Sequence, residues 1–266
     1  MDCILCGSVE TRPYWNERLV QCVNCSLVRA ADRYFTYQPS AIYTDEYFQG
    51  AEYMDYMRER KALMRNFQRR IRTICELAPD ANRLVEIGCG YGFFLELAGR
   101  YWSVKGFEIS EYAVQQAQKL GQPCIWSNYL FEDMRDHVPD IVCLWDTIEH
   151  LATPRRMLEK VASDLRSQGL IAISTGDIGA CLPQLQKSSW RLIHPPTHLW
   201  YFSSVTLVQL LREVGFEPVR IVYPFYYRSL FALLGKLSRY IPRWVGDLPI
   251  PLQTGDIMEV YMRKLA

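Results

Sequence analysis

The chain has 266 residues, of which 49% are hydrophobic and 22% charged, as in an ordinary globular protein. This composition excludes wholesale disorder, collagen and coiled coil as descriptions of the whole chain. Since 30 basic residues balance 29 acidic ones, a partner recognised mainly by its negative charge is not expected. The length predicts one main domain and a small appendage.

The N-terminus lacks the basic start and apolar stretch of a signal peptide, and no run of about 18 apolar residues occurs in the sequence. We therefore expect a cytoplasmic protein. In that reducing compartment, the nine cysteines are expected to bind metal or to fill the core, rather than to form disulfides.

Two cysteine pairs lie near the N-terminus. Each pair has C-x2-C spacing, and fifteen residues separate the pairs, which is typical of a zinc ribbon. The predicted ligands are Cys3, Cys6, Cys22 and Cys25. Four thiolates leave no open position on the ion, so the predicted zinc is structural and stabilises a small domain over residues 1–33.

Residues 34–80 are expected to connect this ribbon to the main domain as an aromatic and helical lid segment. In its second half, apolar residues such as Leu63, Phe67 and Ile71 recur every three or four positions, which predicts an amphipathic helix over 58–77. The many arginines of this helix are expected to form a solvated face, with phosphate binding as the alternative.

From residue 81 to 266, short β-rich runs alternate with helical patterns. This order predicts an α/β domain with a doubly wound, seven-stranded, mostly parallel sheet. The predicted strands lie near 83–88, 103–109, 123–126, 140–145, 169–175, 217–223 and 255–264. The predicted helices lie near 93–100, 111–120, 154–165 and 204–214. Because no helical crossover pattern directly precedes the last strand, that strand is expected to be antiparallel.

The first strand of this domain runs into the segment Glu86-Ile87-Gly88-Cys89-Gly90-Tyr91-Gly92, and Glu108 ends the second strand. Glycines permit a tight turn and close ligand approach, and the later carboxylate can accept bonds from ribose hydroxyls. A dinucleotide fingerprint would need a small residue where this chain has Phe93, and Glu86 would repel a pyrophosphate. The loop therefore favours a nucleoside cofactor with a cationic amino-acid end.

Residues 85–265 resemble a class I, Rossmann-like S-adenosylmethionine-dependent methyltransferase. Besides the glycine loop, the resemblance rests on the segments 104–110, 140–151, 165–175, 198–202 and 215–216. It implies a seven-stranded sheet with an antiparallel last strand. A zinc ribbon ahead of such a domain is similar to bacterial enzymes that methylate sugars or other biosynthetic intermediates.

The resemblance also implies a role for individual residues. The methionine portion of S-adenosyl-L-methionine would be surrounded by Glu86, Gly88, Gly90 and Gly92. Glu108 would hold the ribose, and Ile109 would lie against the adenine. Asn128 would meet the adenine amino group. Trp145 and Asp146, at the carboxyl end of the fourth strand, would face the sulfonium.

Methyl transfer is an in-line displacement that depends on positioning, and on a base where the nucleophile must lose a proton. His198 lies in a loop after the fifth strand that can border the acceptor, and we expect it to be that base. The alternative is a histidine that only holds the loop in place.

The pattern Asp146-x-x-Glu149-His150 admits a further interpretation. Together with another histidine, these residues could bind a divalent ion that orients acceptor oxygens. The alternative is a structural element that precedes the next helix, and this alternative is favoured.

Residues 224–254, between the last two strands, exceed the length of a hairpin. Their apolar residues include Leu230, Phe231, Leu233, Leu234 and Leu237, and their basic residues are Arg228, Lys236, Arg239 and Arg243. The pattern predicts a helical insertion that covers the pocket or contacts a dimer partner. The alternative is a helix on an anionic membrane surface, with a lipid-linked acceptor.

The leading functional prediction is methyl transfer to oxygen or carbon of a small biosynthetic intermediate, with sugar- and lipid-linked molecules among the candidates. One alternative is an RNA base methyltransferase whose ribbon contacts RNA, against which the net charge of +1 argues. Another is a non-catalytic zinc-bearing interaction module, which the complete glycine loop disfavours.

Overall fold

The computed structural model describes residues 1–37 and 55–266. The aromatic part of the predicted connecting segment lies largely outside these residues. The chain divides into two compact units. The first unit comprises Met1–Gln38, Tyr129–Pro224 and Thr254–Ala266, and the second comprises Pro39–Asn128 and Phe225–Gln253. Among the described residues, no helix combines the length and the apolar character needed to cross a membrane.

The predicted α/β fold is confirmed by a seven-stranded sheet with strand order β10-β13-β8-β7-β4-β5-β6. Its strands in chain order are β4 (Arg83–Ile87), β5 (Ser103–Glu108), β6 (Cys124–Trp126), β7 (Ile141–Trp145), β8 (Leu170–Gly176), β10 (Phe216–Val222) and β13 (Ile257–Lys264). The last strand, β13, pairs antiparallel with both β8 and β10, as expected. The pairs β4–β5, β5–β6 and β7–β8 are parallel.

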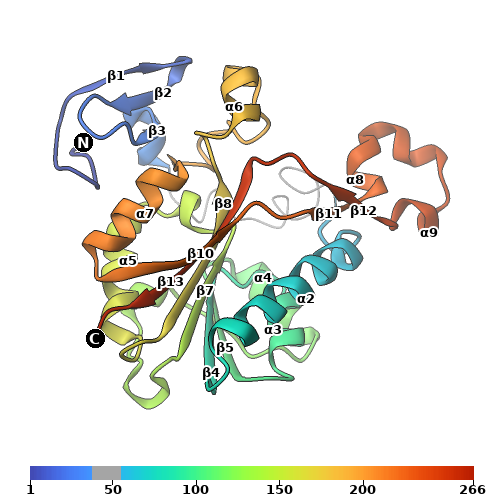
Figure 1. Ribbon diagram of the computed structural model, residues 1–266. Helices are drawn as coiled ribbons and strands as arrows, with labels where there is room; N and C mark the ends of the chain where they lie inside the picture. Colours follow the sequence, from blue (N-terminus) through green and yellow to red (C-terminus); the bar gives the residue numbers. More distant parts are fainter. Residues whose placement is uncertain (38–54) are drawn as a thin grey trace. The chain divides into compact units, whose positions relative to one another are not determined.

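In the first unit, the sheet strands are accompanied by α5 (Pro154–Asp164) and α7 (Ser204–Glu213), and Figure 1 shows α7 alongside β10. A capping box at Ser203 and Thr206 starts α7. Strands β7 and β8 are buried throughout, which is why β7 is a continuous apolar run and β8 begins with four apolar residues. A short helix, α6 (Cys181–Gln186), follows β8.

The N-terminal residues form their own small antiparallel sheet in the first unit. It contains β1 (Thr11–Tyr14), β2 (Asn16–Cys22), β3 (Val28–Ala30) and β9 (Trp200–Tyr201), in that order. Leu19 and Val28 share a core cluster with Trp190 and Tyr201. The N-terminal module therefore buries its apolar residues against the segment after β8, because its own strands are too short to enclose a core.

In the second unit, α2 (Arg60–Leu77) runs alongside α3 (Phe93–Ala98), as Figure 1 shows, and α4 (Glu111–Lys119) follows β5. The predicted solvated basic face of α2 is wrong at Arg70, which is buried. The charge of Arg70 lowers the pKa of Glu86, so the two groups lie near each other inside this unit.

The predicted helical insertion differs from a single helix. Strands β11 (Tyr226–Ser229) and β12 (Pro249–Leu252) pair with each other, and they enclose α8 (Leu230–Leu234), a 3-10 turn over 235–240 and α9 (Arg243–Gly246). Gly235 ends α8 with a φ of +53°, a conformation that a continuous helix cannot contain. We call residues 225–253 the hairpin lobe.

Candidate active site

The glycine loop joins β4 to α3 in the second unit. Gly88, Gly90 and Gly92 have φ values of +78°, +51° and +73°, in the left-handed region that favours glycine. A Cβ on Gly92 would lie 2.7 Å from the Cβ of Gln122, so close packing as well as backbone conformation requires glycine there. These three positions let the backbone turn sharply and contribute no side chains of their own to the loop.

The carboxylate of Glu108 is fixed by three backbone N–H groups. Oε1 accepts bonds from Ile109 at 2.8 Å and Ser110 at 2.9 Å, and Oε2 accepts one from Gly90 at 3.0 Å. Burial raises the pKa of Glu108, and these bonds oppose the rise. Because each carboxylate oxygen can accept two bonds, Oε2 keeps capacity for a ligand hydroxyl beside the loop.

Glu86, the residue at which β4 approaches the loop, is 2% exposed. Among the described residues, its Oε2 is buried and has no hydrogen-bond partner. Burial raises the pKa of Glu86 well above its usual value, the nearby Cys124 adds to the rise, and Arg70 opposes it. Such an orphaned acceptor is costly, and a cationic ligand group would satisfy it.

The end of β5 carries the predicted adenine contact. Ile109 is exposed, and its backbone carbonyl accepts a bond from the indole Nε1 of Trp126 at 3.1 Å. Trp126 ends β6 and is itself exposed. Asn128, two residues further on, is half-buried at the end of the same unit.

In the first unit, Asp146 follows β7 with a φ of +50°. Its backbone N–H donates to the hydroxyl of Ser174 at 3.0 Å, and that hydroxyl donates back to Oδ1 of Asp146 at 2.9 Å. This reciprocal pair orients the carboxylate at the carboxyl end of the strand. The preceding Trp145 is buried and packs edge-on against Tyr261.

Three histidines of the first unit form one cluster. The ring centroid of His198 lies 3.8 Å from that of His194 and 4.6 Å from that of His150. Nδ1 of His150 donates to the carbonyl of Thr197 at 2.8 Å. Burial lowers the pKa of His150 and His194 to about 4, and it lowers that of His198 well below its usual value. All three imidazoles are therefore neutral at pH 7.

One carboxylate joins this cluster. Glu149, His150 and His198 offer ligand atoms that lie within 4.8 Å of one another. The alternative predicted from the sequence, a divalent-ion site, included Asp146 among its ligands. In the structure, Oδ1 of Asp146 accepts a hydrogen bond from the hydroxyl of Ser174. A carboxylate with two neutral imidazoles is a donor set that could hold a metal ion.

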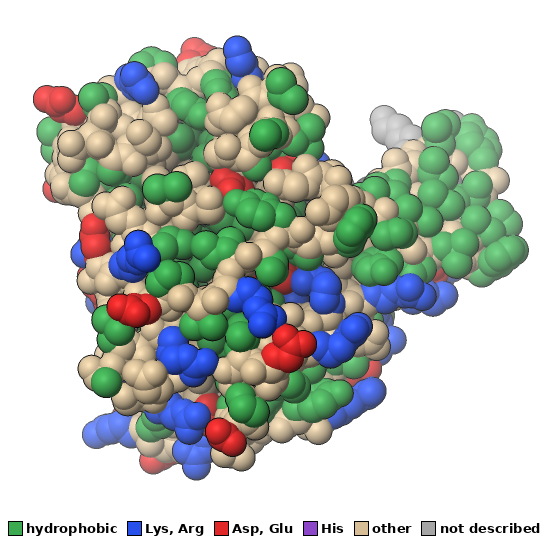
Figure 2. All heavy atoms as spheres, viewed as in Figure 1, with side chains coloured by type: hydrophobic (Ala, Val, Ile, Leu, Met, Phe, Trp, Pro, Cys, Tyr) green, Lys and Arg blue, Asp and Glu red, His purple; other side chains and the backbone are tan. Residues whose placement is uncertain are grey.

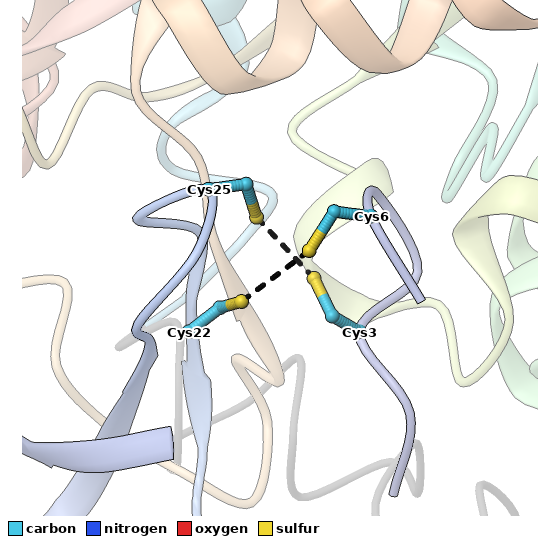
Figure 3. A group of neighbouring side chains, drawn as sticks. All are labelled: Cys3, Cys6, Cys22 and Cys25. Atoms are coloured by element: carbon cyan, nitrogen blue, oxygen red, sulfur yellow. Dashed lines mark hydrogen bonds between the residues drawn. The ribbon is translucent and has the colours of Figure 1, made fainter. Parts of the chain in front are cut away.

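The four predicted zinc ligands also lie together in the first unit. Their sulfurs point toward a common centre (Figure 3), and all lie within 4.8 Å of one another. The sulfurs of Cys3 and Cys25 are 3.4 Å apart, and those of Cys6 and Cys22 are 3.5 Å apart. With Zn–S bonds of about 2.3 Å, a tetrahedral site needs sulfurs about 3.8 Å apart, so this arrangement fits zinc.

Two aromatic residues that contact the glycine loop or Ile109 were not among the predicted site residues. Tyr56 stacks on Phe93, and its hydroxyl would lie 3.4 Å from a Cβ on Gly90. Trp126 lies beside Ile109, as described above. A signal for Trp126 existed, because it ends a predicted parallel strand and ligands bind at the carboxyl ends of such strands. Tyr56 had none, because it lies in a different predicted segment.

The sequence matches a family model described as "Methyltransferase domain" over residues 54–221. No curated protein gives a significant match. Solved structures that share the fold include an S-adenosylmethionine-dependent methyltransferase, a possible histamine N-methyltransferase, from Thermotoga maritima. That chain is 20% identical, with a TM-score of 0.53 over 77% of this chain and 90% of its own.

Two further structures share the fold. A methyltransferase from Archaeoglobus fulgidus is 19% identical, with a TM-score of 0.55 over 83% of this chain and 97% of its own. Magnesium protoporphyrin IX methyltransferase from Synechocystis, solved with bound SAH, is 16% identical, with a TM-score of 0.53 over 78% and 86% of the two chains. At these identities, the likeness concerns the fold.

Proposed function

We propose that this protein methylates an oxygen or carbon atom of a small biosynthetic intermediate. The chain belongs to the methyltransferase-domain family and is an enzyme that uses S-adenosylmethionine. The observation that carries the cofactor part of the proposal is the orphaned, buried Oε2 of Glu86 beside three glycines in the left-handed conformation, and the buried imidazole of His198 supports transfer to a group that must lose a proton. A phosphate-free nucleoside with an ammonium group suits that combination better than a dinucleotide does.

The chain's own residues would hold the cofactor in three places. Glu86 accepts from the ammonium group at the glycine loop, and Oε2 of Glu108 accepts from a ribose hydroxyl. Ile109 and Trp126 offer exposed apolar surface for the adenine, with Asn128 as its polar contact. When bound, S-adenosylmethionine supplies a methyl group made electrophilic by its sulfonium.

The proton of the acceptor needs a receiver, and we assign this role to His198. Its imidazole is neutral at pH 7 because burial disfavours the charged form, so it has a lone pair available. His150 and His194 keep the ring in place from two sides. Asp146, held by Ser174, contributes negative charge that favours a positively charged group at the end of β7.

The proposal includes one structural zinc ion on the four N-terminal cysteines. The closed four-sulfur donor set supports this role, because it leaves no position for a water or an acceptor. It also includes a cytoplasmic location, which is supported by the C-x2-C spacing of the four N-terminal cysteines, because metal-binding thiols are typical of a reducing compartment.

Incorporation of labelled methyl groups tests the acceptor class. The purified protein is incubated with methyl-labelled S-adenosylmethionine and with separate small-molecule, lipid and RNA fractions of a cell extract. Label should enter the small-molecule or lipid fraction and should be lost on His198→Gln. Label confined to the RNA fraction would replace the proposal with RNA base methylation, and label in no fraction would favour the non-catalytic module.

A further inference from the structure

The hairpin lobe carries a continuous set of exposed apolar side chains. We call this set the apolar patch, and it consists of Leu233, Leu237, Tyr240, Trp244 and Leu248. Figure 2 shows hydrophobic side chains gathered over the part of the chain that Figure 1 labels α8 and α9. Tyr240 and Trp244 are 71% and 70% exposed. Large exposed apolar patches on a folded protein mark sites of contact with another surface.

Hydrogen bonds fix the inner side of the lobe to the rest of its unit. The apolar patch is therefore exposed on a folded segment. The side chain of Asn66 accepts from the backbone N–H of Tyr227 at 2.7 Å and donates to its carbonyl at 3.0 Å. The hydroxyl of Ser229 and the carboxylate of Glu59 are hydrogen-bonded and buried. Helix α2 therefore holds β11, and the pairing of β11 with β12 holds the rest.

The charges of the lobe select the kind of surface that it contacts. From Phe225 to Gly246, the sequence contains four basic residues and no acidic one. The side chain of Arg243, next to Trp244, is 77% exposed. The first acidic residue, Asp247, pairs with Arg58 at 2.9 Å and with Arg243 at 3.8 Å, so one carboxylate faces two cations. The sequence of the lobe therefore carries a net positive charge, which complements an anionic surface.

A second copy of this chain suits the patch less well. Symmetric pairing through Trp244 would bring the neighbouring Arg243 of one lobe close to Arg243 of the other, and like charges in a contact repel. An anionic bilayer offers the opposite charge and an apolar layer. Trp and Tyr favour the boundary between headgroups and acyl chains, where the ring is apolar on one side and wet on the other.

We infer that the hairpin lobe docks on anionic lipid membranes. The apolar patch inserts at the level of the headgroups, and the basic residues contact lipid phosphates or carboxylates. This contact requires neither cofactor nor acceptor, so it stands independently of the proposed methyl transfer.

Co-sedimentation with vesicles tests the inference on the full-length protein with its metal. Vesicles of phosphatidylcholine alone are compared with vesicles that contain phosphatidylglycerol, at low and high salt. The protein should pellet with anionic vesicles at low salt and lose most of this binding at high salt, since salt screens the basic residues. The variants Arg243→Glu and Trp244→Ser should each weaken the binding by about tenfold or more.

Matched controls separate the lobe from the rest of the surface. Leu185→Ser removes an exposed apolar side chain elsewhere, and Arg100→Glu reverses an exposed charge outside the lobe. Both should bind vesicles like the unchanged protein. Absence of vesicle binding at low salt, or binding that the two lobe variants leave intact, would overturn the inference. A dimer in sedimentation velocity that Trp244→Ser dissociates, with no vesicle binding, would assign the patch to a second copy.

Discussion

Arg58 and Asp247 form an ion pair with an Nε–Oδ1 distance of 2.9 Å, although 189 positions separate them in the sequence. The same guanidinium lies 3.6 Å from the centre of the Phe231 ring. Two residues before Arg58, Tyr56 lies against the glycine loop at Gly90. The segment that leads into α2 thus contacts the glycine loop through Tyr56 and the hairpin lobe through Arg58, two residues later.

Removal of Arg58 should loosen the lobe. Both partners of the ion pair are largely buried, so Arg58→Leu leaves the Asp247 carboxylate with only the longer contact to Arg243, and the free energy of unfolding should fall by about 2–4 kcal/mol. Urea unfolding measures this change. Arg72→Leu, on the exposed face of the helix α2 that follows Arg58, is the control and should change stability by less than about 0.5 kcal/mol. Equal effects of the two variants would refute the anchoring role.

Cofactor affinity should depend on pH through Glu86. Its pKa is raised in the folded protein, so a rise in pH above the usual carboxyl range deprotonates it gradually. Only the carboxylate attracts an ammonium group, so affinity for S-adenosylmethionine should increase as pH rises, with proton release on binding. Titration calorimetry at several pH values, in buffers of different ionisation enthalpy, measures both. Glu86→Gln should weaken binding and flatten the dependence, and an unchanged slope would assign the proton to another group.

At low pH, kcat should fall less than it would if the base were a solvent-exposed histidine. The pKa of His198 is lowered by burial, so its neutral, proton-accepting form persists below pH 6.5. The acid limb of the kcat profile should therefore lie below that value. His198→Gln should lower kcat by about a hundredfold while cofactor affinity stays nearly constant.

The same assay tests the alternative metal role of this cluster. If Glu149, His150 and His198 held a catalytic ion, Glu149→Gln would abolish activity. Chelator would then also inactivate the unchanged enzyme, and an added divalent metal would restore its activity. With His198 as a metal-independent base, a brief treatment with chelator should leave kcat intact. Loss and metal-specific recovery of kcat would contradict the base assignment.

Elemental analysis should find about one zinc per chain, because four thiolates form one closed site. Cys22→Ser should lower the zinc content and the melting temperature while leaving cofactor contacts in the second unit unchanged. Cys181→Ser, at an exposed and isolated cysteine, is the control. Zinc-free protein of undiminished stability, prepared without chelator, would disprove the structural role.

The sequence predicted the positions of the main-sheet strands along the chain because their signals are local. The buried strand β7 is a continuous apolar run, β8 begins as one, and the glycine loop is contiguous. Long-range contacts left no such signal. The pairing of Val28 with Tyr201, which adds β9 to the N-terminal sheet, joins residues far apart in the chain. The burial of Arg70 likewise depends on what packs against its helix, whereas the periodicity of a helix reports only its own faces.

The proposed function depends on the binding of S-adenosylmethionine by the glycine loop and Glu108. Titration calorimetry of the purified protein with this cofactor tests it most directly, with Glu108→Ala beside the exposed control Glu111→Ala. We expect one site per chain, no competing affinity for NAD, and a loss of about 1.5–3 kcal/mol of binding free energy for Glu108→Ala alone. Unchanged affinity in Glu108→Ala, or tighter binding of NAD than of S-adenosylmethionine, would contradict the account.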